Sequence, residues 1–134
     1  MRQIKHLEKD ALAAKNGFSP AVVTQGGQTV WLSGQLALRD AAGADIAGQF
    51  EPQVRMVFAK IDAILKKAGG VLADVVTMTV YVTDPRYLDR FVDIRREMFP
   101  DENFPASTFL TVSNLPFPGV LVEIQAVAVT AGDA

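Results

Sequence analysis

The segment from Asp74 to Val112 restricts the possible folds of this chain more than any other part of the sequence. It opens with DVVTMTVYVT, whose β-branched residues predict a strand over Asp74–Thr83. A helical pattern follows to about Phe99, and Ala106–Val112 is predicted to be a second strand. A strand, a helix and a strand in this order form a right-handed crossover with parallel strands. The crossover therefore predicts a sheet that carries a helix on one face.

Two amphipathic helices are predicted from apolar residues that recur three and four positions apart. The first covers Glu51–Ala68, with Pro52 in its first turn and Gly69-Gly70 after its end. The second begins at Asp84-Pro85, where Asp is a favourable cap and Pro a favourable first helical residue. The stripe residues are Val54, Val57, Phe58, Ile61, Ile64 and Leu65 in the first helix, and Leu88, Phe91, Ile94 and Met98 in the second.

The remaining segments complete one domain over residues 1–134. Ala21–Thr24 and Thr29–Ser33 are predicted to form a hairpin around a glycine turn, and Val120–Thr130 forms the last strand. Arg39–Gly48 is small and polar, which indicates a loop without core residues. The expected order is β-β-α-β-α-β-β, an α+β fold with a mixed sheet and both helices on one face. The other face then needs a cover, and a second copy of the chain is the simplest one.

Composition excludes several classes of function. The chain has no cysteine, and its 13 basic and 15 acidic residues give a net charge of −2 without a clustered basic face. These features argue against disulfides, thiolate chemistry and nucleic-acid binding. The apolar runs are too short for a membrane helix of roughly 20 residues, and the N-terminus lacks the apolar core of a signal peptide. We therefore expect a cytoplasmic protein without a membrane partner, and the 49% apolar composition favours burial against another subunit.

Glu123 is the strongest candidate for chemistry. In VEIQAVAV the alternation of a strand places Glu123 and Gln125 on one face and Val122, Ile124 and Ala126 on the other. A carboxylate on a largely apolar face can hold a water molecule or act as a general base. The alternative is an interface glutamate that is held by backbone N–H groups or by an arginine of a neighbour, and the sequence leaves both open.

Other candidates are weaker. Ser33-Gly34 ends a strand, where glycine lets backbone N–H groups approach a ligand, although a plain turn is the simpler interpretation. The single histidine, His6, is near the N-terminus, so a Ser-His triad is not expected. Arg95-Arg96 is interpreted as part of a solvated helix face. No group of ligands has the spacing of a metal site, and no glycine-rich nucleotide motif is present.

Several fragments together resemble the Rid/YjgF family, over roughly Phe18 to Val129. The family's YSxAV is similar to FSPAV from Phe18, its VSGQ to LSGQ from Leu32, and its NFPAR(S/T) to NFPAST from Asn103. Its VEIEAIAV is similar to VEIQAVAV from Val122. The resemblance implies a chorismate-mutase-like fold and a homotrimer with small-molecule pockets between subunits. It also implies hydrolysis of reactive imines and enamines without a metal or organic cofactor.

The resemblance assigns expected roles to individual residues. Glu123 matches the water-holding glutamate, and Ser33 and Gly34 match the loop that contacts the substrate. Phe18 stands at a tyrosine position. Ser107 stands where the family has an arginine that binds the substrate carboxylate, and Phe109 matches a pocket residue that is often small. Because Ser107 cannot neutralise a carboxylate, the pocket is expected to be less cationic and more apolar than in the 2-imino-acid deaminases.

Three functional hypotheses follow. The first is a Rid-family hydrolase for a small imine, enamine or related C–N compound without a conventional α-carboxylate, with hydrogen bonds from Ser33, Gly34 and Ser107. The second is a non-catalytic trimer that binds a small molecule or stabilises a partner. The third is 2-imino-acid deamination with an arginine from elsewhere, such as Arg39 or a neighbouring subunit's Arg95 or Arg96. A ribonuclease activity has little support from the charge of the chain.

Overall fold

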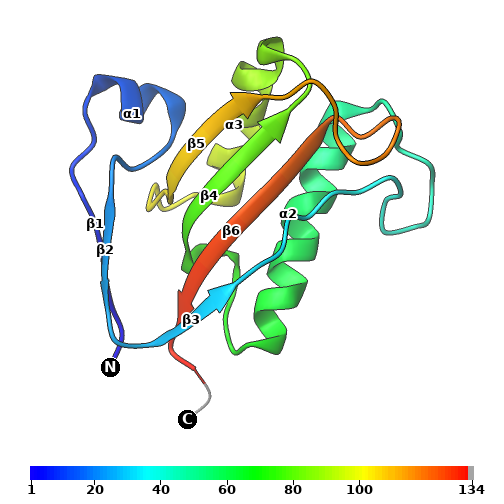
Figure 1. The fold of residues 1–134 in the computed structure, drawn as a ribbon. Helices are drawn as coiled ribbons and strands as arrows, with labels where there is room; N and C mark the ends of the chain where they lie inside the picture. Colours follow the sequence, from blue (N-terminus) through cyan, green and yellow to red (C-terminus); the bar gives the residue numbers. More distant parts are fainter. Residues whose placement is uncertain (133–134) are drawn as a thin grey trace.

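A computed structural model describes residues 1–132. The strands and helices follow one another as shown in Figure 1. The strands are β1 (Gln3–His6), β2 (Val22–Gln25), β3 (Gln28–Trp31), β4 (Val75–Val82), β5 (Ala106–Thr111) and β6 (Val122–Thr130). The helices are α1 (Ala11–Asn16), α2 (Phe50–Lys67) and α3 (Leu88–Met98), with 3-10 turns η1 (Leu72–Asp74) and η2 (Pro85–Tyr87).

The main sheet is four-stranded and mixed, in the order β3-β6-β4-β5. β4 and β5 are parallel, and β6 is antiparallel to both β3 and β4. The parallel pair confirms the crossover predicted from the sequence. A separate ribbon of β1 and β2 lies beside this sheet, and α1 follows β1 near one end of β5 (Figure 1).

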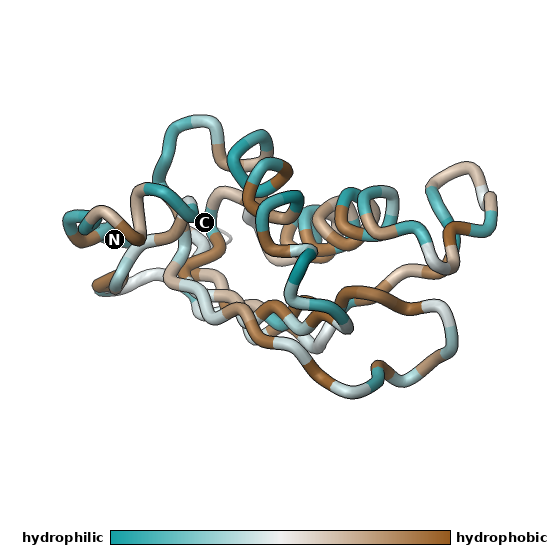
Figure 2. Tube along the Cα trace, turned by 90° about the horizontal axis from the view of Figure 1, so that it is seen from above, coloured by the Kyte–Doolittle hydropathy of each residue, from teal (hydrophilic) through white to brown (hydrophobic). Residues whose placement is uncertain are grey.

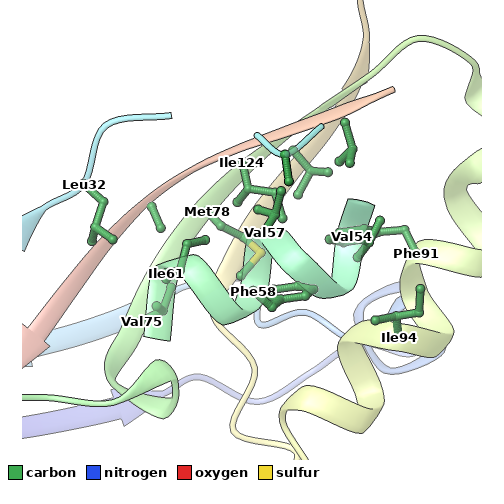
Figure 3. Close-up of a cluster of buried hydrophobic side chains, with 14 of the residues drawn as sticks. Leu32, Val54, Val57, Phe58, Ile61, Val75, Met78, Phe91, Ile94 and Ile124 are labelled. Carbon is green, nitrogen blue, oxygen red and sulfur yellow. The ribbon is translucent and has the colours of Figure 1, made fainter. Parts of the chain in front are cut away.

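Both long helices cover the same face of the four-stranded sheet, as expected. Figure 2 shows this arrangement from above, with the helices on one side of the strands and the other side without a helix. The core lies between the two layers and includes Val57, Phe58 and Ile61 of α2, Met78 of β4 and Ile124 of β6 (Figure 3). The burial of this apolar surface is the main stabilising contribution to the fold.

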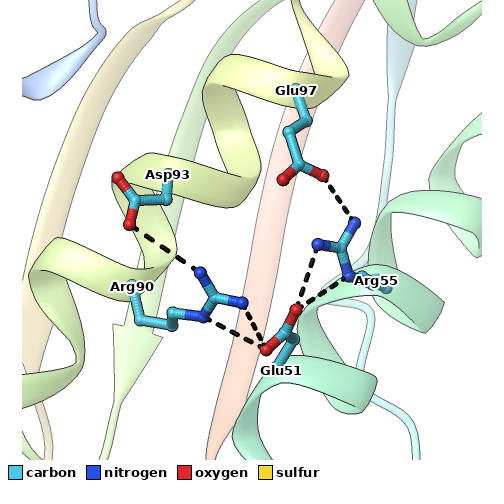
Figure 4. A network of polar contacts seen from close by, with 5 residues as sticks. All are labelled: Glu51, Arg55, Arg90, Asp93 and Glu97. Carbon is cyan, nitrogen blue, oxygen red and sulfur yellow. Dashed lines mark hydrogen bonds and ion pairs between the residues drawn. The ribbon is translucent and has the colours of Figure 1, made fainter.

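Ion pairs join the outer faces of α2 and α3 (Figure 4). Arg55 donates to Glu51 over 3.1 Å and to Glu97 over 2.8 Å, while Arg90 of α3 donates through Nε to Glu51 over 3.1 Å. The guanidinium groups lower the pKa of Glu51 through these hydrogen bonds. Because these groups are exposed to solvent, the network stabilises the helix pair only weakly.

The predicted hairpin is wrong. β2 pairs with β1, with Val23 opposite Lys5, and β3 pairs with β6, so the two predicted hairpin strands belong to different sheets. The intervening Gly26 and Gly27 have φ values of +69° and +77°, a conformation that glycine adopts without strain. The glycines therefore do make a turn, but each strand finds its partner elsewhere in the chain.

Two further expectations about the core are corrected. Strict alternation from Asp74 to Thr83 predicts that Val76 shares the core face with Met78, Val80 and Val82. A β-bulge between Val75 and Thr77 shifts this alternation, so Val75 is buried and Val76 is only half-buried. Ile46 is buried in the core although it lies in the segment that was predicted to be a loop without core residues. None of the helices in residues 1–132 is long and apolar enough to cross a membrane.

Candidate functional site

Glu123 lies on the uncovered face of the main sheet. It is directly opposite Tyr81 of β4, and its neighbours Val122 and Ile124 point the other way into the core. Glu123 is half-buried, and no other group in residues 1–132 donates a hydrogen bond to its carboxylate. The carboxylate is therefore free to interact with a ligand or with another chain.

The loop after β3 passes directly over this carboxylate. Gln35 exchanges two backbone hydrogen bonds with Ile124, over 2.8 and 3.0 Å, and these fix the path of the preceding residues. At Gly34 a Cβ atom would collide with the carboxylate of Glu123 and would lie 3.0 Å from its Cδ atom. A larger residue at position 34 would therefore displace the Glu123 carboxylate from the place that it occupies beside this loop. Ser33 is exposed beside it.

We call the depression at this place the glutamate hollow. It has a volume of about 360 Å³. Its walls include Gly34, Tyr81, Asn114, Leu115, Glu123 and Gln125. In residues 1–132 no three His, Cys, Asp or Glu side chains gather in a way that would hold a metal ion. The polar side chains at the hollow are one carboxylate (Glu123), the amides of Asn114 and Gln125, and the phenol of Tyr81.

Phe18, Ser107 and Phe109 lie in a different depression, which we call the arginine hollow. It has a volume of about 230 Å³ between α1, α3 and β5. Its walls include Leu12, Phe18, Leu88, Arg95, Ser107 and Phe109. Ser107 and Phe109 are opposite Met78 and Val80 of β4, which are core residues, so they point to the face that the helices cover.

The polar group of the arginine hollow is the guanidinium of Arg95. Arg95 is only 1% exposed and packs over the ring of Phe91, with 4.9 Å from its guanidinium carbon to the ring centroid. Its Nη1 donates to Ser107 Oγ over 2.7 Å, and its Nη2 donates to the carbonyl of Asn16 over 3.0 Å. Burial, with a smaller effect of the nearby Arg96, lowers the pKa of Arg95 to about 10.

The two hollows belong to opposite faces of one sheet. Ser107 is aligned with Met78 on the covered face, whereas Glu123 is aligned with Tyr81 on the open face. Met78 and Tyr81 are three positions apart in β4, so their side chains point in opposite directions. The candidate residues are thus brought into two groups: Ser33, Gly34 and Glu123 in one, and Phe18, Ser107 and Phe109 in the other.

The sequence interpretation named Arg95 as a possible replacement arginine from a neighbouring subunit, but it was wrong about the burial of this residue. It was assigned to a solvated helix face, but it is buried, and the adjacent Arg96 is the more exposed of the two. The spacing of apolar residues in α3 indicates that position 95 is buried. Arg95 follows Phe91 by four positions and precedes Met98 by three, so it falls on the apolar stripe of α3.

A mixed four-stranded sheet with two helices on one face defines an α+β protein of the chorismate-mutase-like class. The family model described as endoribonuclease L-PSP matches residues 8–130. The chain belongs to the YjgF/Rid family.

Individual relatives agree with this assignment. A RutC family protein of Pyrococcus horikoshii is 35% identical over 83% of this chain and 85% of its own length. The 2-iminobutanoate/2-iminopropanoate deaminase of Bos taurus is 34% identical over 89% of this chain and 84% of its own length. The crystal structure of the Rid family protein YyfB from Yersinia pestis, described as a protein of unknown function, superposes with a TM-score of 0.80. It is 30% identical and covers 96% of this chain and 98% of its own.

Proposed function

We propose that this protein is a cofactor-independent deaminase that hydrolyses small reactive imines or enamines in a pocket shared between subunits. The observation that carries the proposal is the Glu123 carboxylate, which lies beside Gly34 at the wall of an open hollow and has no partner in residues 1–132. Relatives that are 34% identical bear the name of imine deaminases.

The proposed reaction needs only water and proton transfer. The oxygen of a water molecule adds to the carbon of the C=N bond and gives a carbinolamine. In this first step Glu123 accepts a proton from the water and passes it to the imine nitrogen. In the second step Glu123 accepts the proton of the new hydroxyl group and passes it to the amino group, so that the C–N bond breaks and ammonia leaves with a carbonyl product. Ser33 and the backbone at Gly34 are placed to hydrogen-bond the substrate near Glu123.

Self-association is part of the proposal because one chain does not bring its two hollows together. Trp31 is 78% exposed on β3, opposite Val127, which shares the open face with Glu123. A large apolar side chain on an uncovered sheet face supports a second subunit packed there. We propose a homotrimer in which the arginine hollow of one subunit adjoins the glutamate hollow of the next.

The test measures ammonia release from imines that are generated in the assay, with 2-aminoacrylate among them. We expect Glu123→Gln to lower kcat by about 100-fold or more, since a general base contributes roughly that much. Glu97→Gln makes the same chemical change on the exposed side of α3 and should leave kcat unchanged. Equal rates for wild type and Glu123→Gln would exclude this mechanism.

A non-catalytic role would give a different result in the same experiment. If no imine released ammonia above the buffer rate, while a metabolite remained bound through purification, the protein would be a small-molecule binder. The free Glu123 carboxylate would then serve as a ligand-binding group rather than as a base.

A further inference from the structure

A third hollow lies between α2 and two loops, the one that follows β3 and the one that precedes β6, and we call it the basic hollow. It has a volume of about 400 Å³. Its walls include Leu36, Leu38, Arg39, Met56, Lys60 and Phe117. Small-molecule sites in proteins have volumes of roughly 300 Å³ or more. Within residues 1–132 the basic hollow shares no wall residue with the glutamate hollow or the arginine hollow, so it is a separate place for a ligand.

Most of the wall of the basic hollow is apolar. Met56 and Lys60 are four positions apart on α2, so they are neighbours on one face of the helix. Leu36 and Leu38 line the hollow from the loop after β3. Phe117 lines it from the loop before β6, and its side chain is 53% exposed. A large apolar side chain that is exposed at the wall of a hollow favours a ligand with an apolar part.

The charged side chains of the wall are both basic. Lys60 Nζ donates to the carbonyl of Leu36 over 2.6 Å, and Arg39 Nη1 donates to the carbonyl of Gly43 over 3.1 Å. These acceptors are neutral, and the ion pairs in residues 1–132 involve other basic residues. An ammonium has three donors and a guanidinium five, so both groups keep N–H donors for a ligand. The described part of the chain contributes no acidic residue to this wall, and the complementary ligand is therefore an anion.

We propose that the basic hollow binds a carboxylate that carries an unbranched apolar chain, as a medium-chain fatty acid does. The carboxylate accepts hydrogen bonds from Lys60 and Arg39, and the chain packs against the apolar wall. Two cations match a small head group, and the flexible side chain of Met56 adapts to a chain of variable conformation. The proposal does not depend on hydrolysis at Glu123, so its test requires no imine.

A ligand in the basic hollow would contact the same two loops that border the glutamate hollow. Gly34 and Leu115 line the glutamate hollow, and the residues two positions after them, Leu36 and Phe117, line the basic hollow. A bound ligand would therefore restrict the backbone of both loops. We expect octanoate to slow hydrogen exchange of the amide groups in residues 36–39, as measured by mass spectrometry on the full-length protein.

Isothermal titration calorimetry with the full-length protein tests the head group and the chain separately. Octanoate is the ligand, octanamide is its uncharged counterpart, and acetate has the charge without the chain. We expect octanoate to bind to the wild type about tenfold more tightly than octanamide and about 100-fold more tightly than acetate. A higher salt concentration should weaken the binding of octanoate and not that of octanamide.

Substitutions assign the binding to the basic hollow. Lys60→Met should remove most of the preference for octanoate over octanamide, whereas Lys60→Arg should keep it because the charge remains. Lys67→Met makes the same change at an exposed position of the same helix and should have no effect. Phe117→Ser should weaken octanoate and octanamide about equally, since it shortens the apolar wall and leaves both cations in place.

Three results would overturn the proposal. The first is a wild type that binds neither octanoate nor octanamide, and the second is equal affinity for the two. The third is a preference for octanoate that survives in the double variant Lys60→Met/Arg39→Met but is lost in Arg95→Gln, because the anion would then occupy the arginine hollow. Loss of the preference in Lys60→Met with the affinity unchanged in Arg95→Gln would support the basic hollow.

Discussion

At neutral pH Arg95 keeps its charge in an apolar environment, and this has a consequence for stability. Its pKa of about 10 in the folded chain lies below the ordinary value of 12.5, so burial of the charge opposes folding at every pH below about 10. A bound anion that neutralises Arg95 would raise the free energy of unfolding by mass action.

The single histidine, His6, makes the stability of the fold depend on pH. Its Nε2 atom is buried without a partner in residues 1–132, and burial, together with the charge of Lys9, lowers its pKa below 6.5. Between its folded pKa and 6.5 the unfolded chain binds more protons, so stability rises with pH in that window and is lost as the pH falls. Histidine titrates between roughly pH 7.0 and 5.5. Over this interval we expect the free energy of unfolding to decrease less in His6→Gln than in the wild type.

Urea unfolding at several pH values measures this difference. His6 is the only histidine of the chain, so the variant removes the only imidazole, and the carboxylates contribute equally to both proteins. Parallel pH profiles for the two proteins would show that His6 does not contribute.

At the scale of the elements, the helix α2 also anchors two loops, because its residue Gln53 forms hydrogen bonds with both of them. The side chain is fully buried, and its Nε2 atom donates to the carbonyls of Ile46 and Gly119 over 2.9 and 2.8 Å. Its Oε1 atom accepts from the N–H of Leu121 over 2.8 Å. Gln53 thereby fixes the segment before β6 that continues into Glu123.

We expect Gln53→Leu to lower the free energy of unfolding by about 3 kcal/mol, because it leaves three buried backbone groups without partners. Gln53→Glu should also destabilise, since a carboxylate cannot donate to two carbonyl groups. Glu51→Gln, in the exposed network of Figure 4, is the matched control and should change stability much less than Gln53→Leu does. Urea denaturation measures all three, and an equal effect of Gln53→Leu and Glu51→Gln would contradict the role of Gln53.

For the whole molecule, the separation of the two hollows predicts complementation between subunits. Arg95→Met and Glu123→Gln should each be poorly active alone. Refolded together, they should form mixed oligomers in which some shared sites combine the intact Arg95 of one chain with the intact Glu123 of another. With equal amounts of the two variants and random mixing, a site receives an intact Arg95 from one chain in about half of the cases and an intact Glu123 from the next chain in about half. About a quarter of the sites should therefore be complete, which should restore about a quarter of wild-type activity.

Native mass spectrometry establishes whether mixed oligomers have formed, and their mass gives the number of 14.5 kDa chains in each. Each variant refolded alone is the control. Mixed oligomers that remain inactive would mean that the site lies within one chain.

The fold and the site differ in how far the sequence predicted them. α2, α3 and the strands from β4 to β6 were predicted because their periodicity is local and strong. The elements β1 and α1 were not, since each is short and contains several polar residues. Glu123 was placed on the correct face by alternation alone. Arg95 was misplaced because an arginine on an apolar stripe was interpreted by its charge and not by its position.

The sequence by itself determined the family, the two long helices, the crossover and the face of Glu123, since motifs and alternation are properties of neighbouring residues. Only the tertiary structure decided that β2 and β3 pair with different strands, that Arg95 reaches Ser107, and that this pair lies on the opposite face from Glu123. The physical reason is distance along the chain. Strand pairing and the burial of Arg95 depend on contacts between segments that only packing brings together, and no local pattern encodes which partner is chosen.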